Sequence, residues 1–146
     1  MILEEYDNKI IKTFGVKSYL TLHNLANVER ISFKSNDIEE ILNEALKLVN
    51  NLFGENEILA RITFWDKNYK CLFPLNRILL DEKEDCLIGL YRFQISDFKF
   101  QELIRSHLNY EKGLDPYLNI TVYFFNLDLK IILNIYDDRG ADYLKI

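Results

Sequence analysis

The stretch between residues 119 and 136 constrains the fold most strongly, because apolar and polar side chains alternate along two consecutive segments. A period of two is the pattern of a β-strand whose two faces have different surroundings. Asn126-Leu-Asp128 separates the two segments and predicts a short turn. The chain therefore has a predicted C-terminal β-hairpin, and it leads directly into Asp137-Asp-Arg-Gly-Ala-Asp142.

Helical periodicity of apolar side chains recurs in three other places. In the middle one, Asn36 is a suitable N-cap, and Glu39 follows at the spacing of a capping box. Glycine follows each apolar pattern and favours a C-terminal stop. The sequence predicts helices over Leu3–Phe14, Asp37–Phe53 and about 97–110.

Short alternating segments predict further strands between these helices. They cover Ser18–Leu25, Val28–Phe33, Ile58–Trp65 and Cys86–Ile95, and Ile78–Leu80 is predicted as a strand or a single helical turn. Most connections between neighbouring strands are too short for parallel crossovers. We expect one α+β domain over residues 1–146, with a mainly antiparallel sheet of about five to seven strands and about three helices on one face.

The bulk composition narrows the possible partners. The net charge of −5 argues against nucleic acid, which is normally bound by a basic patch. No apolar stretch reaches the ~20 residues needed to span a bilayer, and the N-terminus lacks the features of a signal peptide. We therefore expect no membrane association and a cytoplasmic protein whose Cys71 and Cys86 are reduced thiols.

A search for catalytic residues favours a protein without enzymatic activity. His23 and His107 are the two histidines, and neither has a recognisable spacing to a nucleophile. His107 lies on the predicted apolar face of its helix, which is typical of a packed imidazole. The glycines form no phosphate-binding loop, and the cysteines have no zinc-site spacing. We expect no cofactor and no bound metal.

The densest charge cluster follows the C-terminal hairpin, and it has three interpretations. Asp137, Asp138 and Asp142 are oxygen ligands of the kind that Mg²⁺ or Ca²⁺ takes. Arg139 lies among them and can neutralise them without a metal, in a turn where Gly140 takes a left-handed conformation. We favour this local brace over a metal site.

The third interpretation makes the same loop a protein-binding surface. Tyr136 and Tyr143 flank it, and tyrosine and arginine often carry much of the energy of protein interfaces. The candidate binding residues are therefore Tyr136, Asp137, Asp138, Arg139, Asp142 and Tyr143.

The segment Asn134-Ile-Tyr-Asp-Asp-Arg-Gly-Ala-Asp142 resembles the C-terminal signature of a family of small, mostly bacterial domains of unknown function. Val122-Tyr-Phe-Phe-Asn126 is similar to the strand that precedes this signature. Glu44-Ala-Leu46, in the helix that follows Arg30-Ile-Ser-Phe33, is similar to an earlier family segment. The resemblance implies an architecture and transfers no catalytic residues.

The function predicted from the sequence is that of a protein-binding module without catalytic activity. More specifically, we expect an immunity protein, which neutralises a bacterial toxin domain by covering its active surface. The alternative is a divalent-metal-dependent enzyme or a small-molecule sensor that uses Asp137, Asp138 and Asp142. A homodimer joined through an exposed sheet face is also possible.

Overall fold

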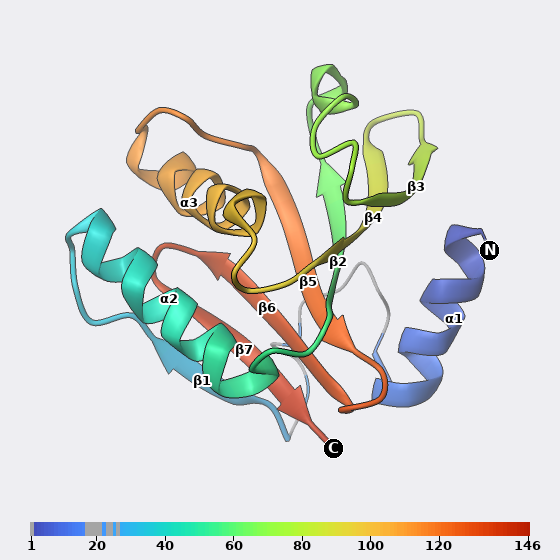
Figure 1. Ribbon diagram of the computed structural model, residues 1–146, viewed down its shortest axis with the longest axis horizontal. Helices are drawn as coiled ribbons and strands as arrows, with labels where there is room; N and C mark the ends of the chain where they lie inside the picture. Colours follow the sequence, from blue (N-terminus) through green and yellow to red (C-terminus); the bar gives the residue numbers. More distant parts are fainter. Residues whose placement is uncertain (1, 17–21, 23–24, 26) are drawn as a thin grey trace.

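The computed structural model describes residues 2–16, 22, 25 and 27–146 (Figure 1). The three helices of this part are α1 (Leu3–Phe14), α2 (Ile38–Phe53) and α3 (Phe98–Lys112). The seven strands are β1 (Glu29–Ser32), β2 (Ile58–Phe64), β3 (Arg77–Glu82), β4 (Leu87–Phe93), β5 (Ile120–Asn126), β6 (Ile131–Asp137) and β7 (Gly140–Lys145). A short 3₁₀ turn, Lys67–Tyr69, follows β2.

All seven strands join one open antiparallel sheet in the order β1-β7-β6-β5-β2-β4-β3. The predicted C-terminal hairpin is confirmed, with Phe124 opposite Leu133. Arg77–Glu82 forms a strand rather than a helical turn. The sequence did not predict β7, which continues from the hairpin and places the C-terminal residues next to β1. The predicted strand Ser18–Leu25 falls largely outside the described residues.

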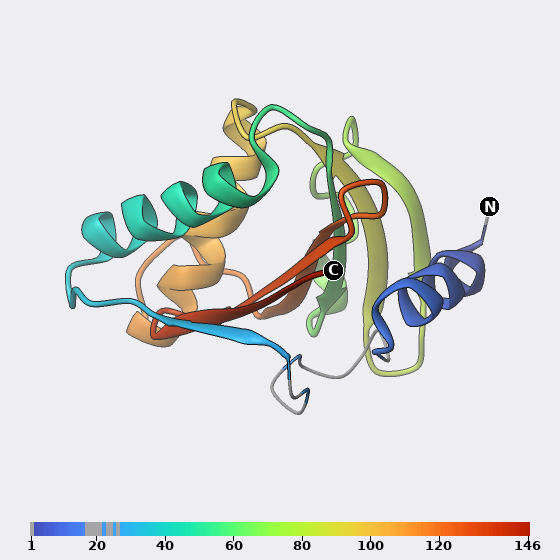
Figure 2. The same cartoon turned by 90° about the horizontal axis from the view of Figure 1, so that it is seen from below.

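The helices cover both faces of the sheet (Figure 2). α2 and α3 pack over the larger core, where Ala45, Val49, Leu103 and Ile104 contact side chains of β2, β5 and β6. α1 lies on the opposite face, and its Ile10 and Phe14 belong to a second cluster. The α+β class, the antiparallel sheet and the three helices are as predicted, but only two of the helices share a face.

An ion pair between a buried arginine and a partly buried aspartate fastens α1 to the second face of the sheet. Successive side chains of a β-strand point to opposite faces of the sheet. Ala60 and Ile62 in β2 point into the main core, so Arg61 between them points to the other face. Its Nε donates to Asp7 Oδ1 at 2.7 Å, and its Nη2 donates to Asp7 Oδ2 at 3.1 Å. The buried charge of the strand is thus matched by one carboxylate of the helix.

The N-terminus of α2 begins one residue later than predicted. Asp37, rather than Asn36, is the N-cap, and its carboxylate accepts a hydrogen bond of 3.2 Å from the backbone N–H of Glu40. Ser35 accepts the backbone N–H of Asp37 at 3.0 Å, and its hydroxyl donates to the carboxylate of Glu40. Aspartate and asparagine both suit this position, so the sequence alone did not distinguish two neighbouring caps.

Candidate functional site

The predicted binding loop is a tight connection between two paired strands. Asp137 ends β6 and Gly140 begins β7, and the two residues face each other in the sheet. Only Asp138 and Arg139 lie between the strands. The loop is therefore a two-residue hairpin turn, and Asp142 belongs to a strand rather than to the loop.

Each carboxylate of this hairpin has a different cationic partner. Arg139 donates from Nη2 to Asp137 at 2.6 Å, and from Nε at 2.9 Å, so the predicted brace forms with this one aspartate. Asp138 lies 3.4 Å from Lys112 Nζ at the end of α3. Asp142 lies 3.9 Å from Arg30 Nε of β1. The three carboxylates do not gather around Arg139 as the sequence suggested.

The same geometry separates the three carboxylates of the alternative metal site. α3 covers the face where Lys112 meets Asp138. Asp142 alternates with Ala141, which points into that core, so its side chain lies on the opposite face of the sheet. Within the described residues, no three His, Cys, Asp or Glu side chains are grouped so that they could hold an ion.

Gly140 is required by a close contact rather than by a left-handed turn. Its φ is not positive, contrary to our prediction. A β-carbon at this position would overlap the backbone carbonyl oxygen of Ile31 in β1 and would lie 2.6 Å from the hydroxyl of Tyr136. Glycine therefore allows β1 and the ring of Tyr136 to approach β7.

Of the six predicted binding residues, Arg139 is the most open to solvent, with a side chain that is 80% exposed. Tyr136 is also exposed, whereas Tyr143 is half-buried against the main core. Asp142 is only 1% exposed. Most of the motif is thus occupied by contacts within the hairpin and with its neighbours.

A pocket of about 640 Å³ lies at another part of the molecule, against α3. Its walls come from the β2–β3 loop, the first turns of α3 and the segment that leads into β5. Its lining residues are Leu42, Tyr69, Cys71, Leu72, Phe73, Pro74, Phe98, Lys99, Gln101, Glu102, Arg105, Ser106, Pro116, Tyr117 and Leu118. Pockets that hold a ligand are mostly apolar with a few polar groups, as here.

Phe73 anchors the β2–β3 loop from inside. Its ring packs edge-on against Tyr91 and Phe93, with ring centroids 6.1 and 5.8 Å apart. Its backbone has a φ of 51°, which is costly for a bulky residue. The buried ring holds the loop in this conformation, and the next two residues, Pro74 and Leu75, are exposed.

One side-chain amide connects this loop both to β4 and to the start of α3. Asn76 Nδ2 donates to the backbone oxygen of Arg92 at 3.0 Å and to Asp97 Oδ2 at 2.9 Å. The other oxygen of Asp97 caps α3 by accepting the backbone N–H of Lys99 at 2.9 Å. One aspartate therefore positions two walls of the pocket.

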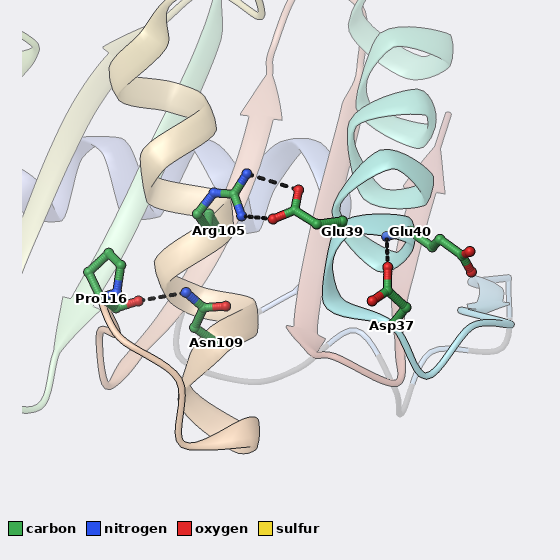
Figure 3. Close-up of polar contacts among 6 residues, drawn as sticks. All are labelled: Asp37, Glu39, Glu40, Arg105, Asn109 and Pro116. Carbon is green, nitrogen blue, oxygen red and sulfur yellow. Dashed lines mark hydrogen bonds and ion pairs between the residues drawn. The ribbon is translucent and has the colours of Figure 1, made fainter.

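The opposite wall is held against α3 by polar contacts (Figure 3). Asn109 Nδ2 donates to the backbone oxygen of Pro116 at 2.8 Å, and the N–H of Leu118 donates to the backbone oxygen of Ser106 at 3.0 Å. Figure 3 also shows Arg105 reaching across to Glu39 of α2, with an Nη2–Oε2 distance of 3.1 Å. This pairing lowers the pKa of Glu39 and raises that of Arg105.

Apolar side chains project around the pocket instead of being covered. Leu75 is 98% exposed and Phe98 is 68% exposed. Tyr117 is also exposed, and its ring centroid lies 5.8 Å from that of Tyr110. Burial raises the pKa of Tyr69, and Asp66 and these two tyrosines add to the effect. We use the name aromatic face for the pocket with its exposed lining residues Phe98 and Tyr117, together with Leu75, which follows the lining residue Pro74.

The pocket of the aromatic face has candidate nucleophiles but, among the described residues, no histidine base beside them. Ser106 and Cys71 line the pocket, but no histidine of the described residues does. His107 lies on the other side of α3, where its Nε2–H donates to the carbonyl oxygen of Ile135. Burial lowers the pKa of this imidazole, which is therefore kept neutral as a packed side chain, as predicted.

A family model described as Domain of unknown function (DUF3885) matches residues 9–144. The chain belongs to this family. The match spans nearly the whole DUF3885 chain, including both the C-terminal hairpin and the aromatic face, and agrees with the predicted resemblance to a family of unknown function. No curated protein and no solved structure matches the DUF3885 chain. None of its described helices is long and apolar enough to cross a membrane.

Sequence reasoning missed the aromatic face of this DUF3885 domain. Phe98 lies at the start of a predicted helix but outside its predicted apolar stripe, and Leu75 and Tyr117 lie in predicted loops. The available signal was the presence of large apolar residues where neither strand nor helix periodicity needed them. His23, the other histidine considered, lies outside the described residues.

Proposed function

We propose that this protein is a protein-binding module and that it binds its partner through the aromatic face. The observation that carries this proposal is the exposure of Phe98, which lines an apolar pocket, and of Leu75, which follows the lining residue Pro74 in sequence. Contiguous exposed apolar groups are costly in a monomer and are typical of interaction sites. Aromatic side chains in such a patch favour interfaces that are centred on a few residues.

A protein partner accounts for this surface better than a small ligand alone. A small molecule would occupy the pocket, but it would leave Leu75 projecting into solvent. A protein can fill the pocket and cover the projecting side chains at the same time. A protein whose surface has both a projecting group and a recess therefore fits this surface better than a small molecule does.

The role that we propose is that of an immunity protein, which covers a toxin domain in the cytoplasm. The net charge of −5 favours encounter with a basic partner, although it acts on the whole chain and not on the aromatic face. A binding role of this kind needs no catalytic residues.

Co-expression with the protein encoded by the adjacent gene tests this role. If the neighbour stops growth, the wild-type chain should restore it, and the double variant Leu75→Ser/Phe98→Ser should not. Ile11→Ser is the matched control, because Ile11 is an exposed aliphatic residue on α1, across the sheet from the aromatic face. Equal protection by the double variant would reject the aromatic face as the binding surface. Failure of the wild type to bind or neutralise its neighbour would reject the immunity role, and self-association in sedimentation would indicate a homodimer.

A further inference from the structure

We infer that the pocket of the aromatic face receives an uncharged aromatic side chain with a polar tip, tryptophan or tyrosine, from the protein partner. This inference rests on the proposed function and specifies the group that the partner inserts. It follows from three properties of the pocket: its size, the pairing of its charges and a hydroxyl without a hydrogen bond.

The size and lining of the pocket suit a large flat side chain. At about 640 Å³ it falls within the range of roughly 300–1,000 Å³ that holds whole ligands, so an aromatic group fits with room for its backbone. Phe73 and Leu118 are buried residues of its lining, and Tyr69 and Tyr117 add further rings. Aromatic rings pack favourably edge-to-face or offset against such neighbours.

The charges at the pocket are already paired, which argues against a charged occupant. Arg105 is bound to Glu39, and Lys99 Nζ lies 3.1 Å from Glu102 Oε2. An anion would compete with these carboxylates for their cations, and a cation would compete for the carboxylates. An uncharged group disturbs neither pair and still gains from leaving water.

Ser106 provides the polar contact. The residue lines the pocket and is only 7% exposed. Its backbone oxygen accepts the N–H of Leu118, whereas its hydroxyl makes no hydrogen bond within the described residues. The N–H of tryptophan or the O–H of tyrosine can reach a hydroxyl while the ring stays in apolar surroundings. Phenylalanine would leave this hydroxyl unused.

The test uses side-chain mimics and ¹⁵N-labelled protein. N-acetyltryptophanamide and N-acetyltyrosinamide should bind saturably and shift the amide signals of Phe98, Ser106 and Leu118. N-acetylphenylalaninamide should bind about three- to tenfold more weakly, the range expected for one net hydrogen bond. The charged analogues indole-3-acetate and tryptamine should bind more weakly than the uncharged N-acetyltryptophanamide.

A matched variant separates the hydroxyl from the shape of the pocket. Ser106→Ala should reduce the affinity for N-acetyltryptophanamide to about that for N-acetylphenylalaninamide and leave the latter unchanged. Equal affinity of wild type for all five probes, shifts outside the pocket, or no shifts at millimolar probe would overturn the inference. These comparisons on wild-type protein hold even if Ser106→Ala does not fold. Loss of neighbour binding in the Leu75→Ser/Phe98→Ser variant alongside any of these results would retain the proposed function and reject only this occupant.

Discussion

The C-terminal hairpin and the aromatic face differ in whether their side chains already have partners within the protein. At the hairpin, each of three adjacent or nearly adjacent carboxylates is paired with a cation from the same turn, from α3 or from β1. At the aromatic face, Leu75 and Phe98 project with little protein around them. A dense motif can thus serve the fold, while residues scattered over the sequence form the surface that is available to a partner.

The largest loss of stability should follow Gly140→Ala, because the new methyl group meets a backbone atom. The carbonyl oxygen of Ile31 cannot rotate away as a side chain can, so β1 must shift from β7. We expect the free energy of unfolding in urea to fall by about 2–3 kcal/mol, the upper part of the usual range for overpacking. Ser32→Ala is the control, since Ser32 is the exposed residue opposite Gly140. If Gly140→Ala is as stable as the wild type, the close contact with β1 does not require glycine, and the structural role of the motif is contradicted.

Acid should weaken the packing beneath the hairpin through His107. Burial lowers the pKa of this imidazole below its ordinary value of 6.5, while the carbonyl of Ile135 and the carboxylate of Asp137 oppose the shift. The unfolded chain therefore takes up the proton first, and the stabilisation present above pH 6.5 is lost as the pH falls below it.

His107→Gln isolates this effect, because the glutamine amide can still donate to Ile135. Between about pH 7.5 and pH 5, the wild type should lose up to about 2 kcal/mol more unfolding free energy than the variant. Urea titrations at several pH values measure the difference. Parallel pH profiles would show that the imidazole is protonated equally in both states, and this would contradict its burial as a neutral side chain.

Beneath the pocket of the aromatic face, the substitution Tyr91→Phe should increase the free energy of unfolding. Tyr91 packs against Phe73, but its hydroxyl is buried and has no hydrogen-bond partner among the described residues. Burial raises the pKa of Tyr91 to about 12. Removing an unsatisfied hydroxyl without changing the ring should stabilise the fold by about 1 kcal/mol in urea unfolding. A loss of stability instead would reveal a partner for that hydroxyl.

Arg139→Ala should have a small effect, although Arg139 is the most visible residue of the motif. Its side chain is mostly in water, so its pairing with Asp137 is weakened by solvent and by salt. We expect a smaller loss of stability than for Asp142→Asn, which alters a buried carboxylate. Unfolding measured at low and high sodium chloride should show the Arg139 effect shrink with salt. If Arg139→Ala instead abolishes partner binding, the hairpin is part of the interface.

Most of the fold could be predicted because periodicity directly reports which faces are buried. α1 was predicted at its observed bounds, and the β5–β6 hairpin was predicted, although its turn covers 127–130 rather than 126–128. β7 was missed because Asp137 and Asp142 were assigned to one charged loop, whereas a two-residue turn separates two strands. The side of the sheet that α1 covers was also missed, because its partner Arg61 was not recognised as a buried charge.

The site was harder to predict, because its parts are distant in sequence. Pro74, which precedes Leu75, and Tyr117 line the same pocket only because the β2–β3 loop and the segment before β5 meet at α3. No local pattern links them, and each alone is an ordinary exposed apolar residue. The charged hairpin attracted attention because its residues are adjacent in sequence, but adjacency in sequence makes mutual pairing easier as well.

The smallest effect on stability should come from Leu75→Ser, and it tests the comparison most directly. Since this side chain is almost completely exposed, its loss should change the free energy of unfolding by less than about 0.5 kcal/mol. The same variant should weaken partner binding at least tenfold if Leu75 is a central contact of the interface. Isothermal titration with the protein encoded by the adjacent gene, with Ile11→Ser as the control, measures this. Unchanged affinity would mean that the partner does not cover Leu75. The aromatic face would then not be the binding surface, although the structural role of the hairpin would still hold.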